Sequence, residues 1–125
     1  MPKKRDSGMA AALALRPRLR VLRDAEIALG PGKVDLLESI ASTGSIAEAA
    51  RRLGMSYTRA WKLVRSMNGC FRAPLILAAR GGRERGGAEL TADGQAALRL
   101  YRQMEIDSRA GAERNWRALR RLLRP

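Results

Sequence analysis

The chain has 125 residues, of which 46% are hydrophobic and only 4% aromatic, a composition that suits one small and mainly helical domain. Twenty-five Lys and Arg against 12 Asp and Glu give a net charge of +13, which favours a polyanion as partner, either nucleic acid or an anionic membrane. With no His and one Cys, the chain cannot assemble a zinc cluster, a His-based catalytic triad or an internal disulfide, so we expect no metal, no cofactor and no enzyme activity.

The first 16 residues predict a flexible basic tail rather than a signal peptide. Their apolar stretch is short and runs directly into Arg16-Pro-Arg-Leu-Arg20. Nowhere does an apolar run approach the roughly 18 residues of a membrane span. We therefore expect no membrane partner and a cytoplasmic location, associated with the bacterial nucleoid. A lone Cys agrees with this location, because thiols stay reduced in the cytosol.

A β-hairpin and a first helix are expected next. Residues 18–23 alternate charged and aliphatic side chains, and residues 26–30 do so more loosely, which predicts two paired strands. Gly30-Pro-Gly32 ends the second strand. Apolar residues at helical spacing predict a helix from Lys33 to Thr43, with Gly44 at its carboxyl end.

Two short helices around a tight turn follow. Ser45, with Glu48 three residues later, forms a capping box that begins the first of them, and Gly54 provides the turn. Ser56 caps the second helix, which we expect over residues 56–68. The buried faces are predicted to comprise Ile46, Ala49, Ala50 and Leu53 in the first helix, and Tyr57, Ala60, Trp61, Val64 and Met67 in the second.

This pattern is typical of a helix-turn-helix, whose second helix enters the major groove of DNA. On the opposite face of helix 56–68, Arg59 could pair with guanine O6 and N7, and Thr58 could contact a thymine methyl or a phosphate. The alternative is an ordinary solvated helix face. Tyr57 and Trp61 could stack on bases, but their spacing favours core packing, with the Tyr57 hydroxyl near the surface. We expect DNA contacts from Ser45, Ser56, Tyr57, Thr58, Arg59, Lys62, Arg65 and Ser66.

A two-stranded wing is predicted after a loop at Asn68-Gly69. Residues 74–78 and 88–90 form its strands, and the glycine-rich stretch of residues 80–87 forms its tip. Its cations could contact phosphates or enter the minor groove, positioning the protein rather than reading sequence. The alternative is an exposed loop without a ligand. The wing contacts are expected from Arg80, Arg83 and Arg85.

A long last helix begins after Thr91, and Gly111 predicts a break near residues 108–112. Its apolar positions could fold back on the domain, or pair with a second copy, which we favour. The Arg residues near its end form a solvated rim, a phosphate contact or a membrane-facing surface. The apolar positions are Ala97, Leu100, Tyr101, Met104, Trp116, Leu119, Leu122 and Leu123.

The predicted fold is mainly α with small β: a winged helix-turn-helix with an N-terminal hairpin and a long C-terminal dimerisation helix. Its parts are a tail (1–16), a DNA-binding domain (17–91) and a helical extension (92–125). The lone Cys70 has no neighbouring His to activate it, so we interpret it as a structural or incidental thiol.

Several short motifs occur in the order of one known family. They are Gly44-Ser-Ile-Ala-Glu-Ala-Ala50, Met55-Ser-Tyr-Thr-Arg-Ala-Trp61, Met67-Asn68, Pro74-Leu75, Gly81-Gly82 with Gly86-Gly87, Glu89-Leu-Thr91, Gly94-Gln95 and Leu100-Tyr101. Over residues 18–105 they resemble the N-terminal domain of ModE-type molybdate-responsive repressors, relatives of the LysR-type winged helix. The resemblance implies a dimeric bacterial transcription factor with recognition helix 56–67 and wing 80–89, and dimer contacts through the hairpin region and the last helix.

Two departures from that family limit what the resemblance implies. Full-length ModE proteins carry C-terminal molybdate-binding domains, and no segment here resembles them, so molybdate binding is not expected of this chain. The wing is also more highly charged, at Arg83-Glu-Arg85, than the family pattern. We expect a dimeric, sequence-specific regulator that binds double-stranded DNA. The alternatives are a nonspecific architectural DNA-binding protein, or a protein- or membrane-surface module acting through the basic last helix.

Overall fold

The computed structural model describes residues 12–78 and 87–125, which form two compact units. The winged unit comprises residues 18–104, and the terminal unit comprises residues 105–125 with the chain up to residue 17. The predicted tail up to residue 11 and the wing-tip residues Arg80, Arg83 and Arg85 lie outside the described residues.

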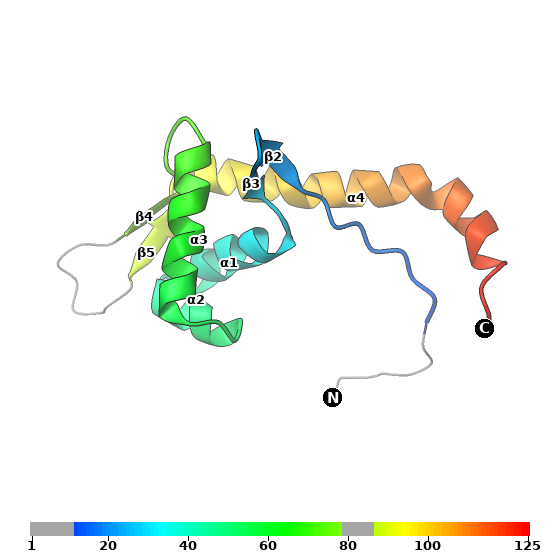
Figure 1. The fold of residues 1–125 in the computed structure, drawn as a ribbon, viewed down its shortest axis with the longest axis horizontal. Coiled ribbons are helices and arrows are strands. Elements are labelled where there is room, and N and C mark those ends of the chain that lie inside the picture. Colours follow the sequence, from blue (N-terminus) through cyan, green and yellow to red (C-terminus); the bar gives the residue numbers. More distant parts are fainter. Residues whose placement is uncertain (1–11, 79–86) are drawn as a thin grey trace. The chain divides into compact units, whose positions relative to one another are not determined.

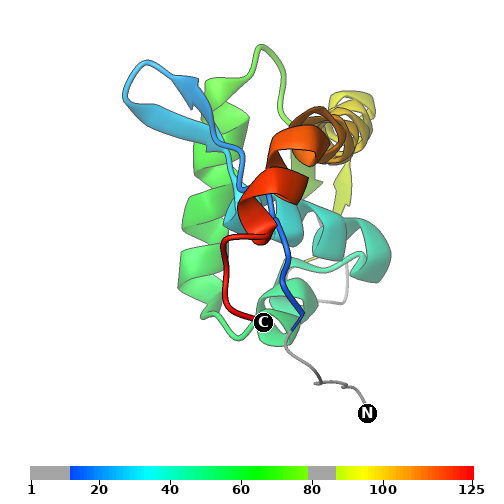
Figure 2. The same ribbon diagram turned by 90° about the vertical axis from the view of Figure 1, so that its right-hand side faces the viewer.

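The N-terminal hairpin of the winged unit is confirmed. Strand β2 (Val21–Arg23) pairs antiparallel with β3 (Glu26–Leu29), and Asp24 adopts a positive φ of 55° in the turn. Pairing begins at Val21, three residues later than the alternation at residue 18 suggested. The hairpin lies beside helix α3 in both ribbon views (Figures 1 and 2).

Helix α1 (Pro31–Thr43) begins two residues earlier than predicted. Pro31 occupies the first turn, where its fixed φ suits a helix and its missing N–H costs no hydrogen bond, so the Pro starts the helix rather than preceding it. The helix ends as expected at Gly44, which has a left-handed φ of 71° and donates its N–H to the Ile40 carbonyl.

The helix-turn-helix consists of α2 (Ile46–Arg52) and α3 (Tyr57–Cys70), joined through Gly54 with a φ of 68°. Helix α3 runs beyond the expected end at residue 68. The side chain of Asn68 there bonds the N–H groups of Leu75 and Ile76, at 2.8 and 3.1 Å, and so holds the following segment against the helix. Tertiary contacts, rather than Gly69, therefore set where this helix ends.

The capping box is only half formed. The Ser45 hydroxyl accepts the Glu48 N–H at 3.0 Å as predicted. The Glu48 carboxylate pairs instead with Arg51 and Arg52, so it does not complete the reciprocal bond. Ion pairing one turn along the helix competes with the box for the same carboxylate.

The wing consists of β4 (Ile76–Ala78) and β5 (Ala88–Leu90), which pair antiparallel with Ile76 opposite Leu90. Its base is held to the corner between α1 and α2, because the Ala88 N–H donates to the Gly44 carbonyl at 3.0 Å. Strand β5 has the predicted bounds, and β4 begins two residues later than predicted.

Helix α4 (Ala92–Arg120) follows the wing, and the Thr91 hydroxyl caps it by accepting the Gly94 N–H at 3.0 Å. The predicted break near residues 108–112 is wrong, since the helix continues through Gly111. One glycine costs a helix only about 1 kcal/mol, and its Arg, Ala and Glu neighbours are good helix formers.

A single apolar core fills the winged unit, with side chains from every helix and from β3, β4 and β5. Two residues predicted to be buried are exposed: Leu53 (37%) and Tyr57 (44%). Leu53 is the C-terminal cap of α2, where the chain leaves the helical path, and Tyr57 lies in the first turn of α3, at the edge of the core. The architecture is the predicted winged helix-turn-helix.

Candidate DNA-binding surface

The exposed face of α3 is fixed by what the helix buries. Ala60, Val64 and Met67 are at most 2% exposed and anchor the helix in the core of the winged unit. The Ser56 hydroxyl accepts the Arg59 N–H at 3.0 Å and defines the first turn. As a result the predicted contact residues Thr58, Arg59, Lys62 and Arg65 all lie exposed to solvent.

The cations on this face are not neutralised by any acidic side chain that the structure describes. Within residues 12–78 and 87–125, no carboxylate forms an ion pair with Arg59, Lys62 or Arg65. Their charge is available to an external anion.

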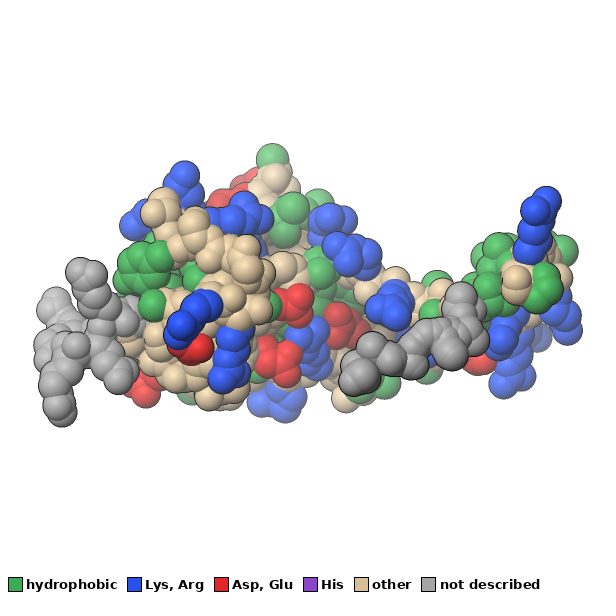
Figure 3. Space-filling model, turned by 90° about the horizontal axis from the view of Figure 1, so that it is seen from below, with side chains coloured by type: hydrophobic (Ala, Val, Ile, Leu, Met, Phe, Trp, Pro, Cys, Tyr) green, Lys and Arg blue, Asp and Glu red, His purple; other side chains and the backbone are tan. Residues whose placement is uncertain are grey.

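Three acidic residues of the winged unit, Asp35, Glu38 and Glu48, pair with cations that do not belong to this face. Arg102 of α4 lies 3.2 Å from Asp35 and also pairs with Glu38, both on α1. On the face seen in Figure 3, acidic and basic side chains lie beside one another. The excess positive charge is therefore unevenly distributed, and part of it is concentrated on α3.

Tyr57 extends this face instead of packing in the core. Its ring meets Trp61 edge to face, with the centroids 6.3 Å apart and an angle of 86° between the planes. Trp61 is half-buried and packs against the core, as the sequence predicted. Trp61 thus holds Tyr57 at the solvent edge of α3, with a ring and a hydroxyl open to a partner.

The three serines among the predicted contact residues already have hydrogen-bond partners. Ser45 and Ser56 cap α2 and α3. The Ser66 hydroxyl donates to the Glu26 carboxylate at 2.8 Å and accepts from the Lys33 ammonium at 2.7 Å. Ser66 thereby connects α3 to β3 and α1, a structural role that the sequence did not indicate.

This polar connection changes the acidity of two of its members. The hydrogen bond from Ser66, followed by one from Cys70, lowers the pKa of Glu26 below its usual range. Partial burial, followed by the bond to Glu26, raises the pKa of the Cys70 thiol. Cys70 is therefore a neutral hydrogen-bond donor to Glu26, next to the turn of the hairpin, rather than an activated nucleophile.

A basic groove beside α3 was missed by the sequence analysis. It has a volume of about 280 Å³ and is lined on one side by Arg59 and Leu63 of α3. The other side comprises Arg18, Arg20, Ile27 and the start of α1, from Gly30 to Lys33. The available signal was the alternation of Arg18 and Arg20 with Leu19, which turns both guanidinium groups outward when Leu19 packs on the core.

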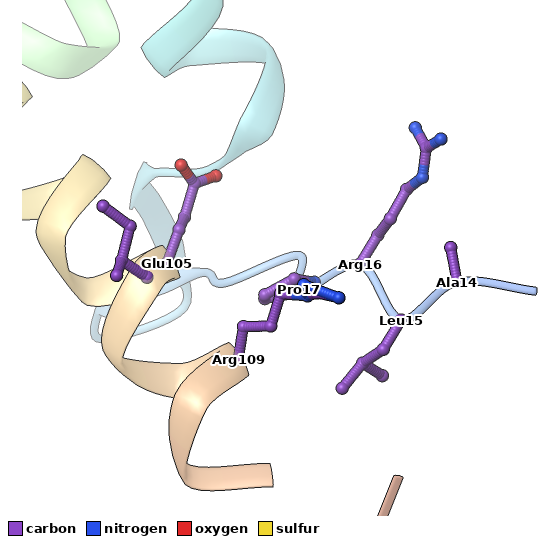
Figure 4. Close-up of a pocket in the computed structure, with 7 residues that line it drawn as sticks. Ala14, Leu15, Arg16, Pro17, Glu105 and Arg109 are labelled. Carbon is purple, nitrogen blue, oxygen red and sulfur yellow. The ribbon is translucent and has the colours of Figure 1, made fainter. Parts of the chain in front are cut away.

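The terminal unit has a second hollow, of about 500 Å³, between residues 14–17 and the part of α4 at Glu105, Ile106 and Arg109. Its polar groups do not converge on a common point, since the guanidinium of Arg16 extends away from Glu105 and Arg109 (Figure 4). It lacks the few convergent polar groups typical of a small-molecule site. In the described part of the chain no cluster of His, Cys, Asp or Glu could hold a metal, and none of the helices is long and apolar enough to cross a membrane.

Comparisons with known proteins agree with this geometry. The family described as "Bacterial regulatory helix-turn-helix protein, lysR family" matches residues 32–95. The chain is 44% identical over 77 residues to the molybdenum-pterin-binding protein MopB of Rhodobacter capsulatus, covering 62% of this chain and 28% of that protein. It is 41% identical over 71 residues to the DNA-binding transcriptional dual regulator ModE of Escherichia coli (strain K12), covering 57% of this chain and 27% of that regulator.

The fold is also similar to a solved DNA complex. The structure described as a CbnR_DBD–DNA complex has 26% sequence identity and a TM-score of 0.53, and the match covers 70% of this chain and 95% of that one. The predicted resemblance to the ModE type is confirmed over the matched residues. The matched segments span less than a third of the length of these two curated relatives.

Proposed function

This chain belongs to the LysR family of bacterial regulatory helix-turn-helix proteins, and from that premise we propose that it regulates transcription by binding specific sites on double-stranded DNA. It acts through binding rather than catalysis, in the bacterial cytoplasm. The observation that carries this proposal is the exposed face of α3, whose three cations have no acidic partner among the described residues.

Helix α3 is the element that enters the major groove. Its width with side chains, about 10–12 Å, matches the roughly 12 Å of that groove. Thr58 and Lys62 lie in its first two turns, the part of a recognition helix that reaches base edges. Tyr57 and Arg65 extend the contact along the flanking backbone, and Arg80, Arg83 and Arg85 do so from the wing.

The protein acts as a homodimer through α4. Leu100 and Met104 are 55% and 42% exposed at the end of the winged unit, and Ile106 and Leu119 are 61% and 55% exposed in the terminal unit. Leu122 and Leu123, which the sequence placed on this helix, lie beyond its end at Arg120. Apolar side chains this exposed on a long helix favour a second copy that covers them. Two-fold symmetry then predicts a pseudo-palindromic site.

In vitro selection of bound duplexes from a random pool tests this function. We expect one enriched motif with two half-sites about one helical turn, or roughly 10 bp, apart. The selected duplex should stay bound in excess random-sequence DNA. A pool that remains random, with equal binding to all duplexes, would contradict sequence-specific regulation and support an architectural role.

A further inference from the structure

We propose that the basic groove holds one sugar-phosphate strand of the DNA duplex, next to the major groove that α3 enters. This inference rests on the proposed function and deepens it. It adds Arg18 and Arg20 to the DNA-binding surface and assigns Arg59 to the phosphate backbone rather than to a base.

The first argument is the charge that remains available in the groove. Arg18, Arg20 and Arg59 form no ion pair with any carboxylate of residues 12–78 and 87–125. Lys33, the fourth cation, is already engaged, because its ammonium bonds the Ile27 carbonyl and the Ser66 hydroxyl. Three guanidinium groups, which match phosphate oxygens well, therefore line the groove without an acidic partner among the described residues.

The backbone that carries these cations is held in place. The hydroxyl of Tyr101, which is only 1% exposed, donates to the Leu19 carbonyl at 2.6 Å and fixes the chain between Arg18 and Arg20. The stem of Arg20 also lies against Gly30, where an added Cβ would be 3.7 Å from the Arg20 Cγ. The backbone of Arg59 is also fixed, in the capped first turn of α3. Binding a phosphate then costs no ordering of the backbone at these positions.

The start of α1 adds a smaller contribution. No side chain caps this helix, and no acidic residue lies in its first turn. Its positive end, at Gly30 to Lys33, lines the same groove as the three arginines. The dipole is a minor addition to three full charges.

The identity of the anion follows from the position of the groove. Arg59 belongs both to the exposed face of α3 and to the wall of the groove, so the two surfaces are continuous. A duplex that admits α3 into its major groove must place a phosphate strand along each side of the helix. The groove lies on the hairpin side of α3, which makes a phosphodiester strand its occupant rather than a free anion or a lipid headgroup.

The test compares two double variants that each remove two positive charges. Arg18→Gln/Arg20→Gln changes the groove, and Arg72→Gln/Arg99→Gln is the control at two exposed cations outside it. Affinity is measured against salt, for the selected duplex and for a random-sequence duplex. Each phosphate that the protein no longer neutralises should decrease the slope of log K against log salt by about 0.9. We expect a decrease of roughly 1.8 per protomer for the groove variant and little change for the control.

A second measurement locates the contact on the DNA. Neutral methylphosphonate linkages are placed one at a time along the selected duplex. Wild type should lose affinity at flanking positions where the groove variant does not, while both should keep the same preferred sequence. Equal slopes and equal methylphosphonate sensitivity in groove variant and control would overturn the proposal.

Other outcomes separate this inference from the proposed function. If selection yields no motif but the groove variant still loses its salt dependence, regulation at specific sites fails and the phosphate surface stands. If a motif is selected and the groove variant behaves as the control, only the groove assignment fails. If the groove variant lost binding to anionic phosphatidylserine vesicles but bound DNA as wild type does, the groove would be a lipid-binding surface and the assignment to DNA would be overturned.

Discussion

Neighbouring side chains in the first two turns of α3 have different surroundings. Arg59 lines the basic groove, whereas Thr58 and Lys62 lie on the exposed face and do not line it. The sequence alone favoured Arg59 as the base-reading residue, because a guanidinium matches guanine. Nothing in the sequence revealed that Arg18 and Arg20, about 40 residues earlier, share a groove with it.

We expect Lys62→Ala to reduce discrimination between the selected duplex and random DNA, by roughly 5- to 150-fold, since a good base contact is worth about 1–3 kcal/mol. Arg59→Ala should weaken binding to both duplexes by the same factor. The ratio of the dissociation constants for the two duplexes, measured at one fixed salt concentration, gives the discrimination of each variant. A larger loss of discrimination in Arg59→Ala than in Lys62→Ala would restore Arg59 as the base reader.

The Glu26–Ser66 bond predicts a pH dependence of stability. Because the pKa of folded Glu26 is lowered, its ionised form stabilises the fold at neutral pH. That stabilisation disappears as pH falls through the folded pKa. Thermal unfolding should show Glu26→Gln less stable than wild type at pH 7, and the two should converge only when the pH falls below the usual range of a carboxyl pKa. In a protein that also carries Ser66→Ala, the difference in stability at pH 7 between Glu and Gln at position 26 should be smaller. A gap that persists in acid would mean that Glu26 acts through packing instead.

At the scale of elements, α4 contains two glycines with opposite roles. Gly94 is buried, and an added Cβ there would lie 2.1 Å from the Leu75 carbonyl oxygen, which accepts the Thr91 N–H. Gly111 has nothing within 4 Å of such a Cβ. Close approach to the wing therefore requires the first glycine, and nothing in the described structure requires the second.

We expect Gly94→Ala to lower the free energy of unfolding by about 1–3 kcal/mol, because the helix must shift away from β4. Gly111→Ala should raise it by about 0.5–1 kcal/mol, through helix propensity alone. Urea unfolding of each variant measures the difference. If both changes stabilised the protein, the contact between Gly94 and Leu75 would not constrain the fold.

The order of elements could be predicted from periodicity, caps and glycines. Hairpin, three helices, wing and last helix all occur where local signals placed them, because each signal acts within one or two turns of chain. The predicted burial of Tyr57 and Leu53 and the predicted end of α3 were wrong for a common reason. Burial at the edge of a core depends on which neighbour covers a side chain, and the end of α3 depends on the segment after the helix, which Asn68 bonds at Leu75 and Ile76.

The candidate site shows the same division between local and distant information. The exposed cations of α3 follow from helical spacing within one segment, whereas the groove joins residues 18–20, 30–33 and 59–63. That juxtaposition depends on Leu19 and Tyr101, which are 82 positions apart. A single sequence gives no local signal of such a pair.

At the scale of the whole molecule, the proposed dimer depends on the terminal unit. A chain ending at Met104 keeps the complete winged unit and removes residues 105–125. We expect this truncation to be folded, as judged by circular dichroism, and monomeric by light scattering, while the full chain is dimeric. A dimer that survives the truncation would show that the terminal unit is dispensable, and that Leu100 and Met104 or the hairpin are sufficient for the interface.

Tyr101 gives the assembly a thermodynamic property. Its hydroxyl, on α4, donates to the Leu19 carbonyl and so holds the segment that carries Arg18 and Arg20. The helix that we propose to join two copies therefore also holds the segment whose cations we assign to DNA. If dimerisation orders that segment and so strengthens DNA binding, then DNA binding must strengthen dimerisation by the same factor, because coupling between two binding equilibria is reciprocal. Subunit exchange should therefore slow on DNA, and Tyr101→Phe, which removes only the hydroxyl, should reduce that slowing.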